Sequence, residues 1–362
     1  MGSPEGAGEA AGSPPDLDPE RIRTAGPVTS RDVARLAGVS QATVSRVLHG
    51  SAKVAPATRD RVLSVVEATH YQPNAAAASM RTSRSGTIGV VVNRITNPFY
   101  PQLLQALGAR LEPHGLRMIL WDAATGPGER AAIEAIEQKR ADGLVFTTAT
   151  ANSSALRHAI ERQVPIVLIN RVVDDQPCDQ VDSANEDTAA RIARYFADNG
   201  HERVGLITAP TRASTAASRI AGFSQEVANL GLHLDERHVV DGDFSYAGGK
   251  AALERMLAAG IDPPTAVFAV NDHSALGALD AAGAAGVAVP EQLWVVGYDD
   301  IEMASWDAFQ LTTACQPITE MVRVSVELLL ARIAAPDEPP VHHRFPGEIV
   351  VRRSTAHVPV ST

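Results

Sequence analysis

Residues 28–50, VTSRDVARLAGVSQATVSRVLHG, constrain the fold more than any other stretch, because they predict two short helices that cross at a sharp angle. Thr29 or Ser30 can cap the first helix, and Ser40 can cap the second. Gly38 supplies the backbone freedom that the turn between them needs. Apolar residues recur at helical spacing and predict one shared core, made of Val33, Ala34, Ala37, Val44, Val47 and Leu48. The segment is therefore predicted to be a helix-turn-helix.

The outward face of the second helix carries polar side chains near its N-terminus. Gln41 and Arg46, with Ala42 beside them, suit the hydrogen-bonding edges of bases in the major groove of DNA. The alternative is an ordinary helical hairpin whose polar face is solvated. A third helix is predicted near Ala57–Thr69, after a proline at a position that helix N-termini accept.

The charge of the chain is divided unevenly along its length. The formal net charge is −10, yet residues 28–85 carry eight Lys and Arg against three acidic residues, a net charge of +5. Residues 1–27 carry −3, which leaves −12 for the segment from Gly86 onward. A basic head on an acidic body is what a protein that contacts phosphates with one end would show, so the charge gives weak support for DNA binding.

Cysteine usage and the N-terminus indicate a cytoplasmic protein. Cys178 and Cys315 have no metal-ligand or redox spacing and fit a reducing compartment. No run approaches the ~20 apolar residues of a membrane span, and the acidic, Gly/Pro/Ala-rich start has no secretory core.

From Thr87 onward, short aliphatic runs alternate with helical segments, in two successive series. The predicted strands of the first series are 88–92, 117–121, 143–147 and 165–169, with helices that include 101–111 and 128–139. The predicted strands of the second series are 204–208, 239–242, 266–270 and 294–297. Two βα series of similar size predict two doubly wound α/β lobes, with a ligand site at the carboxyl ends of the strands.

With head and body both in view, the chain resembles the LacI/GalR (lactose-repressor) family of bacterial transcriptional regulators. Beside residues 28–50, the segments that carry the resemblance are YQPN at 71–74, NPFY at 97–100, RIAGF at 219–223, FAVND at 268–272, VVGYDD at 295–300, LTT at 311–313 and VVRRST at 350–355. The resemblance implies a DNA-binding head, a hinge helix and a periplasmic-binding-protein-like body with two lobes, acting as a homodimer on a palindromic operator.

The resemblance also sets the expected domain limits. A flexible extension at 1–27 precedes the head at 28–72, the hinge helix and linker at 73–86, and the effector-binding and dimerisation domain at 87–362. Lobe one is expected at about 87–184 plus 317–345, and lobe two at about 185–316 plus 346–362. The tail carries no leucine heptad, so nothing predicts assembly of dimers into a tetramer.

By the same resemblance, Gln41, Ala42 and Arg46 read the operator. Arg46 suits guanine, Gln41 suits adenine, and the Ala42 methyl suits thymine. The residues expected to hold the DNA backbone are Thr29, Ser40, Thr43, Ser45, Thr58, Tyr71 and Asn74. Met80 stands where the family inserts a wedge into the minor groove; an alanine-rich linker is the alternative there. Ala55 departs from the capping serine that related heads often carry.

Seven residues are implied as the effector site in the cleft between the lobes: Asn93, Phe99, Asn170, Arg219, Phe244, Asn271 and Asp299. Amides, an arginine–aspartate clamp and an aromatic ring are the groups that hold a sugar. The alternatives are that Asp299 or Asp300 caps a helix and that Phe244 belongs to the core. Ala184 and Thr188 depart from the family pattern, so the resemblance does not predict the interface contacts of the first helix of lobe two.

Three functions compete at this stage. The first is a repressor switched by a sugar-like effector, and the second is the same architecture responding to a nucleoside or purine corepressor. A solute-binding receptor is more distant, because the chain shows a helix-turn-helix and no signal peptide. No catalytic, cofactor or metal-binding residues are predicted, since the chain shows no phosphate loop, no metal-spaced His/Cys set and no Ser-His-Asp arrangement.

Overall fold

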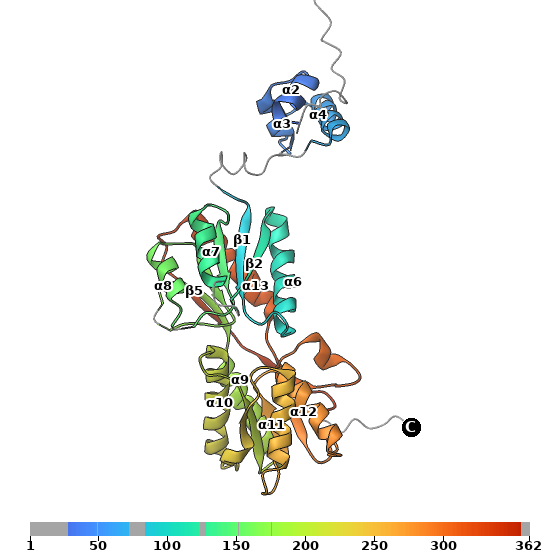
Figure 1. The fold of residues 1–362 in the computed structure, drawn as a ribbon, viewed down its shortest axis with the longest axis vertical. Coiled ribbons are helices and arrows are strands. Elements are labelled where there is room, and N and C mark those ends of the chain that lie inside the picture. The colour runs from blue at the N-terminus through green and yellow to red at the C-terminus, as the bar shows by residue number, and fades with distance from the viewer. Residues whose placement is uncertain are drawn as a thin grey trace, which may run out of the picture. The chain divides into compact units, whose positions relative to one another are not determined.

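The structure, a computed structural model, describes residues 28–48, 50–71, 84–123, 128–150, 152–174 and 176–355. It divides into two compact units, a head that ends at Ser83 and a body that begins at Arg84 (Figure 1).

The described residues of the head form three helices, α2 (Ser30–Leu36), α3 (Gln41–Leu48) and α4 (Pro56–Thr69). Thr29 caps α2 in a capping box: its hydroxyl accepts the backbone N–H of Asp32, whose carboxylate accepts the backbone N–H of Thr29. Ser40 Oγ accepts the backbone N–H of Thr43 at 3.1 Å, and Gly38 takes a φ of +61° in the turn. Both predicted caps and the predicted turn are confirmed.

The head has a small apolar core that joins all three helices. The buried members are Val33, Ala34, Ala37, Val44, Val47 and Val62, and Leu48 packs against them. Val65 and Val66 of α4 also pack against this core, whereas Leu63 stays 45% exposed. Ala55 is the N-cap residue of α4 and makes no side-chain hydrogen bond. The start of α4 therefore lacks the capping oxygen that a serine at this position would supply.

The part of the body that the structure describes forms two six-stranded sheets, each with helices on both faces (Figure 1). Lobe one is the sheet in the order β11-β5-β4-β3-β1-β2 with its helices, and all of its strand pairs are parallel. Its elements are β1 (Thr87–Val92), α6 (Phe99–Leu111), η1 (Glu112–His114), β2 (Arg117–Asp122), α7 (Gly128–Glu137), β3 (Gly143–Phe146), α8 (Ser154–Glu161), β4 (Ile166–Ile169), β5 (Asp179–Ser183), α13 (Ile318–Ala334) and β11 (His342–Phe345).

Lobe two is the sheet in the order β12-β10-β9-β8-β6-β7 with its helices, and only β12 runs antiparallel, to β10. Its elements are α9 (Asn185–Asp198), β6 (Val204–Thr208), α10 (Ser214–Leu230), η2 (Glu236–His238), β7 (Val239–Asp241), α11 (Tyr246–Leu257), β8 (Ala266–Ala269), α12 (Asp272–Ala284), β9 (Trp294–Asp299), η3 (Glu302–Ser305), β10 (Thr312–Cys315) and β12 (Glu348–Val350). The chain therefore passes between the lobes after β5, after β10 and after β11.

The strand order places a topological switch point in each lobe. The strand β1 lies between β2 and β3, and β6 lies between β7 and β8, so the winding direction reverses at both positions. Loops that leave neighbouring strands in opposite directions open a crevice at the carboxyl ends of those strands. Both crevices contribute to the cleft described below.

The sequence did not predict β5, because its residues Asp-Gln-Val-Asp-Ser are mostly polar. All five are buried, and the polar groups find partners in other elements. The Asp179 carboxylate accepts Arg332 Nε at 3.0 Å and the backbone N–H of Val341 at 2.9 Å, while Gln180 bonds to the backbone of Val173. A strand can therefore be polar and buried when tertiary contacts satisfy it.

Two of the predicted strands lie at the edges of their sheets. The strand β2 exposes Ile119 and Leu120 to 41% and 43%, and β7 exposes Val239 to 38%.

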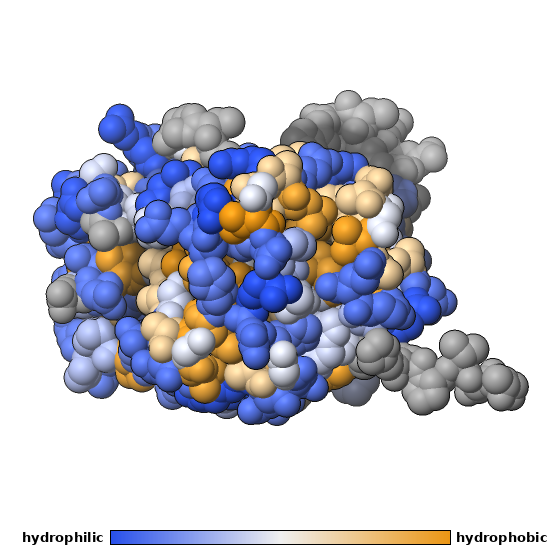
Figure 2. All heavy atoms as spheres, turned by 90° about the horizontal axis from the view of Figure 1, so that it is seen from below, coloured by the Kyte–Doolittle hydropathy of each residue, from blue (hydrophilic) through white to orange (hydrophobic). Residues whose placement is uncertain are grey.

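The face of the molecule drawn in Figure 2 is mostly hydrophilic, with hydrophobic residues in several separate areas.

Candidate DNA-reading face and ligand cleft

The predicted base-reading residues lie on the exposed face of α3. Gln41, Ala42 and Arg46 are all exposed, while Val44 and Val47 on the opposite face are buried. Gln41 Nε2 donates to Ser30 Oγ at 2.7 Å, which steers the amide toward the start of α2. This contact leaves the Gln41 carbonyl oxygen and a second N–H available. The helix therefore presents the three side chains together, and their role in base readout stays a prediction.

The residues predicted to hold the DNA backbone differ in how far contacts within the head already engage their side chains. The Thr29 hydroxyl donates to Asp32 Oδ2 at 2.6 Å, and the Ser40 and Thr43 hydroxyls bond each other at 2.9 Å. The hydrogen bonds from Thr29, with a smaller effect of Arg35, lower the pKa of the Asp32 carboxyl. Ser45, Thr58 and Tyr71 are half-buried, and Tyr71 packs against the head core.

Two predicted contacts, Asn74 and Met80, lie outside the described residues, as do the extension at 1–27 and most of the hinge at 73–86. Two basic residues that were not singled out have structural partners: Arg61 Nε donates to the carbonyl of Ala37 at 2.8 Å, and Arg59 Nη2 donates to the carbonyl of Ser51 at 2.7 Å. These bonds tie α4 to the turn after α2 and to the loop before α4.

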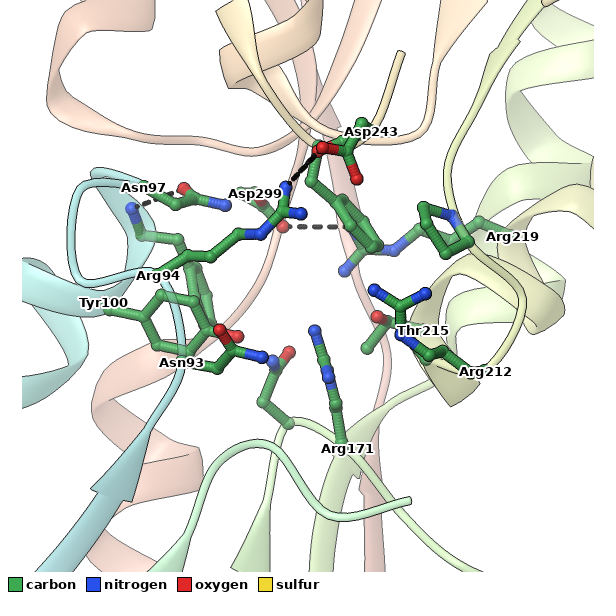
Figure 3. Close-up of a pocket in the computed structure, with 15 residues that line it drawn as sticks. Asn93, Arg94, Asn97, Tyr100, Arg171, Arg212, Thr215, Arg219, Asp243 and Asp299 are labelled. Atoms are coloured by element: carbon green, nitrogen blue, oxygen red, sulfur yellow. Dashed lines mark hydrogen bonds and ion pairs between the residues drawn. The ribbon is translucent and has the colours of Figure 1, made fainter. Parts of the chain in front are cut away.

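A cleft in the body is lined by residues from both lobes and has about 600 Å³ of empty space, including its open mouth (Figure 3). Six of the seven predicted effector residues line it: Asn93, Phe99, Asn170, Arg219, Phe244 and Asp299. The other lining residues are Arg94, Asn97, Tyr100, Arg171, Pro210, Arg212, Ala213, Thr215 and Asp243. Most of these follow β1, β4, β6 or β7, so the rule of examining polar residues after strands could have found them.

Backbone strain is concentrated in this cleft. Five of its non-glycine residues take positive φ values, namely Arg94 (54°), Asn170 (72°), Asp243 (48°), Phe244 (54°) and Asp299 (125°). Such conformations cost about 1–3 kcal/mol each and persist only where the surroundings hold them. They turn side chains directly after strands into the cleft.

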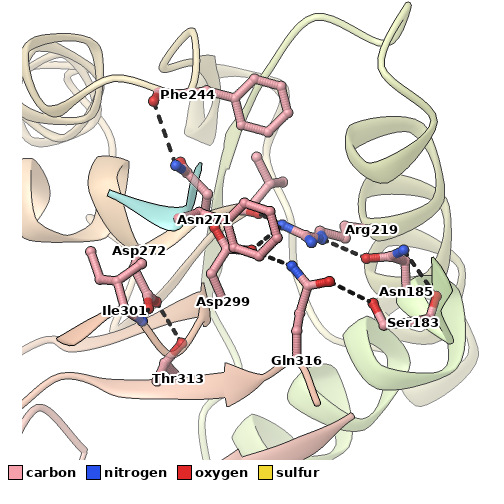
Figure 4. Close-up of polar contacts among 12 residues, drawn as sticks. Ser183, Asn185, Arg219, Phe244, Asn271, Asp272, Asp299, Ile301, Thr313 and Gln316 are labelled. Carbon is pink, nitrogen blue, oxygen red and sulfur yellow. Dashed lines mark hydrogen bonds and ion pairs between the residues drawn. The ribbon is translucent and has the colours of Figure 1, made fainter. Parts of the chain in front are cut away.

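Arg219 is the centre of a buried network in the lobe-two wall (Figure 4). Its guanidinium donates to Asn185 Oδ1 at 2.7 Å, to the carbonyl of Val270 at 2.7 Å and to Asp299 Oδ1 at 3.1 Å. The group also lies 3.6 Å from the centre of the Tyr298 ring. Arg219 and Asp299 are 2% and 4% exposed, so this ion pair is fully inside the protein.

The network continues into the strands that connect the lobes. Gln316 Nε2 donates to Asp299 Oδ1 at 2.8 Å, and Ser183 Oγ donates to Gln316 Oε1 at 3.1 Å. Burial raises the pKa of Asp299, while Arg219 and Gln316 oppose that shift. Asp299 ends β9 instead of capping a helix, and Asp300 pairs with Arg352 at 2.7 Å. The ring of Phe244 both lines the cleft and packs against the lobe-two core.

Asn271 is the predicted effector residue that does not line the cleft. It caps α12, with its Oδ1 accepting the N–H of Ser274 at 3.3 Å, and its Nδ2 donates to the carbonyl of Phe244 at 3.5 Å (Figure 4). It is 1% exposed. Its side chain therefore bonds to the backbone of the cleft residue Phe244, and its role in effector binding stays a prediction.

Asp272 is a second buried carboxyl that the sequence did not single out. It accepts the backbone N–H of Ile301 at 2.9 Å and the Thr313 hydroxyl at 2.5 Å. Burial raises its pKa well above the ordinary value, and the charges of Asp299 and Asp300 raise it further.

Two contacts cross the cleft between the lobes. Arg94 Nη1 donates to the Asp243 carboxylate at 2.8 Å and to its backbone carbonyl at 2.6 Å (Figure 3). Ser214 Oγ accepts the backbone N–H of Val172 at 3.0 Å. The lobes are therefore held near each other at the mouth by an ion pair and a hydrogen bond.

Within the described residues, no helix is long and apolar enough to cross a membrane. The same residues include no cluster of three or more His, Cys, Asp or Glu side chains placed to hold a metal ion.

Both units match known protein families. Residues 29–74 match the family of bacterial regulatory proteins described as the lacI family. Residues 85–336 match the family of periplasmic binding proteins and sugar binding domains of the LacI family.

Similar proteins cover nearly the whole chain. The HTH-type transcriptional regulator GalS of Salmonella typhimurium is 35% identical, over 91% of this chain and 97% of that protein. The HTH-type transcriptional repressor PurR of Photobacterium profundum is 30% identical, over 90% of this chain and 98% of that protein. Among solved structures, the lac repressor dimer bound to operator and the anti-inducer ONPF has a TM-score of 0.80 at 27% identity, covering 91% of this chain and all of that one.

Proposed function

The chain belongs to the LacI family of bacterial regulatory proteins, and from that premise we propose that its cleft binds a small sugar-like metabolite that changes the affinity of its head for an operator. It is a DNA-binding transcriptional regulator and not an enzyme. The observation that carries the proposal is the presence of two sites in one chain. An exposed polar face on α3 is built on a closed helical core, and a polar cleft is lined by both lobes.

On the DNA side, we propose that Arg46 pairs with a guanine and Gln41 with an adenine, while Ala42 contacts a thymine methyl. A bidentate side-chain contact to the right base is worth about 1–3 kcal/mol of discrimination. The hydroxyls of the head and Asn74 would hold the phosphates, which fix register without reading sequence. Met80 would enter the minor groove between two copies of the hinge segment at 73–86.

The proposed assembly is a homodimer on a palindromic operator, because a symmetric dimer places two heads on two half-sites. A solved relative whose match covers 91% of this chain is a dimer bound to operator. The proposed location is the cytoplasm, where the operator is.

On the ligand side, the cleft offers groups that recognise hydroxyls. Asn93 and Asn170 supply amides from lobe one, and the Arg219–Asp299 pair supplies charged partners from lobe two. The Phe244 ring can lie against an apolar C–H face of a sugar. Contacts from both lobes favour one relative arrangement of the lobes, and a coupling of about 1–3 kcal/mol would shift operator affinity by 5- to 150-fold.

The test is binding to palindromic DNA from the genomic neighbourhood of the gene, measured by fluorescence anisotropy with the purified full-length chain. We expect specific binding that weakens at least tenfold in Arg46→Ala. We expect almost no change in Arg237→Ala, which removes an exposed arginine of lobe two that is paired with Asp235. The proposal would be contradicted if the protein, with ligand removed, bound none of this DNA.

A nucleobase or nucleoside is the second candidate ligand, since an aromatic ring such as Phe244 can stack on a base as well as on a sugar. Calorimetric titration with a sugar panel and a nucleobase panel separates the two. Binding of nucleobases alone would replace the sugar in the proposal.

A further inference from the structure

The cleft contains more arginine charge than its own carboxylates neutralise. Four arginines and two aspartates line it, although residues 86–362 as a whole carry a net charge of −12. The local sign is therefore opposite to the sign of the body around it. A cleft of this kind attracts and concentrates anions.

Two of the four arginines are already neutralised. Arg94 pairs with Asp243, and Arg219 pairs with Asp299 while also donating to an amide oxygen and a carbonyl. A ligand is therefore not needed to neutralise either arginine. Their charges are compensated inside the protein.

The other two arginines, Arg171 and Arg212, have no carboxylate partner among the residues that the structure describes. Arg171 follows β4 in lobe one, and Arg212 precedes α10 in lobe two. Figure 3 shows both side chains directed into the cavity from different walls. The neighbour of Arg171 is the neutral hydroxyl of Tyr100, whose pKa is raised by burial while Arg171 opposes the rise.

Buried polar atoms on the lobe-one wall also lack partners. Arg171 Nε and Asn170 Oδ1 are both buried, and neither makes a hydrogen bond to a described residue. Burying such atoms without partners destabilises the folded protein. A ligand that offers an anionic acceptor to Arg171 and a hydroxyl donor to Asn170 removes both costs.

We propose that the effector is an anionic, hydroxylated metabolite, such as a sugar phosphate or a sugar acid, whose anionic group lies between Arg171 and Arg212. This inference rests on the proposed function, since it specifies the ligand of the same cleft. A neutral sugar would leave two guanidinium charges uncompensated in a closing cleft. Guanidinium groups bind phosphate and carboxylate oxygens through paired hydrogen bonds, so arginine fits this task.

The anion has a structural reason to close the cleft. It joins a charge on lobe one to a charge on lobe two, so its binding favours the arrangement in which the two walls face each other. The helix α10 begins beside Arg212 without a side-chain cap and without an acidic residue in its first turn. The positive end of its dipole therefore adds to the field of the two arginines.

The first experiment tests the anion site with inorganic phosphate. The melting temperature of the full-length chain is measured in sodium phosphate and in sodium chloride of equal ionic strength. At a phosphate concentration ten times its Kd, we expect phosphate to raise the wild-type Tm by about 2 °C or more over chloride. The shift should disappear in Arg171→Gln/Arg212→Gln and shrink in Arg212→Gln, whose exposed side chain is not needed for folding.

Arg255→Gln is the matched control, because it removes one exposed arginine from α11 outside the cleft, and it should keep the full shift. Equal phosphate shifts in all four proteins, or no shift in the wild type, would overturn the proposal.

The second experiment compares matched ligands by calorimetry: ribose with ribose 5-phosphate, and glucose with glucose 6-phosphate and gluconate. We expect an anionic member to bind at least tenfold more tightly than its neutral parent, and Arg212→Gln to remove most of that advantage. A preference for the phosphates over gluconate identifies the anion as phosphate, and the reverse identifies it as carboxylate. A neutral parent that binds as tightly as its anionic forms contradicts the inference.

Operator binding is measured separately on the same protein, so the two failures can be told apart. If the protein binds operator but responds only to neutral sugars, this inference is wrong and the proposed function stands. If it shows the arginine-dependent phosphate shift but binds no operator, the proposed function is wrong and the anion site stands.

Discussion

The two walls of the cleft are built in different ways, although the two lobes have closely similar sheet topologies. In lobe two, Arg219, Asp299 and Gln316 satisfy one another through buried hydrogen bonds. In lobe one, Asn170 and Arg171 carry buried polar atoms that have no hydrogen-bond partner among the described residues. The Arg219 network of lobe two is complete by itself, whereas Asn170 and Arg171 of lobe one have hydrogen-bonding capacity to spare.

This difference assigns separate tasks to the walls. A satisfied network holds its side chains in one geometry and gives a ligand a fixed surface. Unsatisfied groups contribute little to folding and gain partners only when a ligand arrives. We therefore expect mutations in the Arg219 network of lobe two to act on stability, and mutations of Asn170 and Arg171 in lobe one to act on ligand binding.

The largest expected effect separates two arginines of the same cleft. Arg219→Gln leaves the Asp299 carboxylate buried without a positively charged partner. Removing one partner of a buried pair lowers the free energy of unfolding by about 3–5 kcal/mol. Arg171→Gln should change it by less than about 1 kcal/mol. Urea unfolding of the two variants measures the difference, and equal costs would remove the distinction between the walls.

The pH dependence of stability should come from Asp272 of lobe two. Its raised pKa means that the folded protein keeps a proton that the unfolded chain has already lost, so stability falls as pH rises above the ordinary Asp value toward the raised pKa. The slope is at most about 1.4 kcal/mol per pH unit for one proton. Asp272→Asn should flatten this part of the curve in denaturant titrations at several pH values. An unchanged slope would mean that another group carries it.

Helix packing provides a third comparison, with a smaller effect. A Cβ at Gly222 of α10 would lie 2.1 Å from the carbonyl oxygen of Glu186 in α9, whereas a Cβ at Gly108 of α6 would meet only the end of the Met118 side chain at 3.5 Å. Gly222→Ala should therefore destabilise lobe two by about 1–3 kcal/mol. Gly108→Ala should be neutral or stabilising by up to about 1 kcal/mol, because alanine is the better helix former. Thermal unfolding of both variants is the measurement.

The smallest effect is expected for the ion pair that crosses the cleft mouth. The side chains of Arg94 and Asp243 are 41% and 49% exposed, and exposed pairs contribute about 0.2–1 kcal/mol. A double-mutant cycle with Arg94→Ala and Asp243→Ala should give a coupling in this range that declines with added salt. A coupling of several kcal/mol would show that the walls are locked together before any ligand binds.

Much of the fold could be predicted because its signals are local. The caps at Thr29 and Ser40, the turn at Gly38 and the aliphatic strands follow from side-chain chemistry within a few residues. The strands β5 and β10 could not be predicted in this way. The strand β5 becomes a strand because Arg332 and the backbone of Val341, more than 150 positions away, satisfy Asp179.

The candidate site shows the same division. The sequence located six of the cleft residues through the segments that resemble the family. Asn271 was grouped with them, and the structure places it beside the backbone of Phe244, outside the lining of the cleft. Arg171 and Arg212 were overlooked although they follow β4 and β6, and a linear sequence does not say whether either arginine is paired with an acidic residue.

The sequence by itself determined the kind of molecule: a helix-turn-helix head, a body of two α/β lobes and the family to which both belong. These follow from periodicity, capping and short-range spacing, which a chain carries in its order of residues. Only the tertiary structure decided which charges in the cleft are neutralised. Charge pairing depends on distances between groups up to about 150 residues apart, such as Arg94 and Asp243, and folding alone sets those distances.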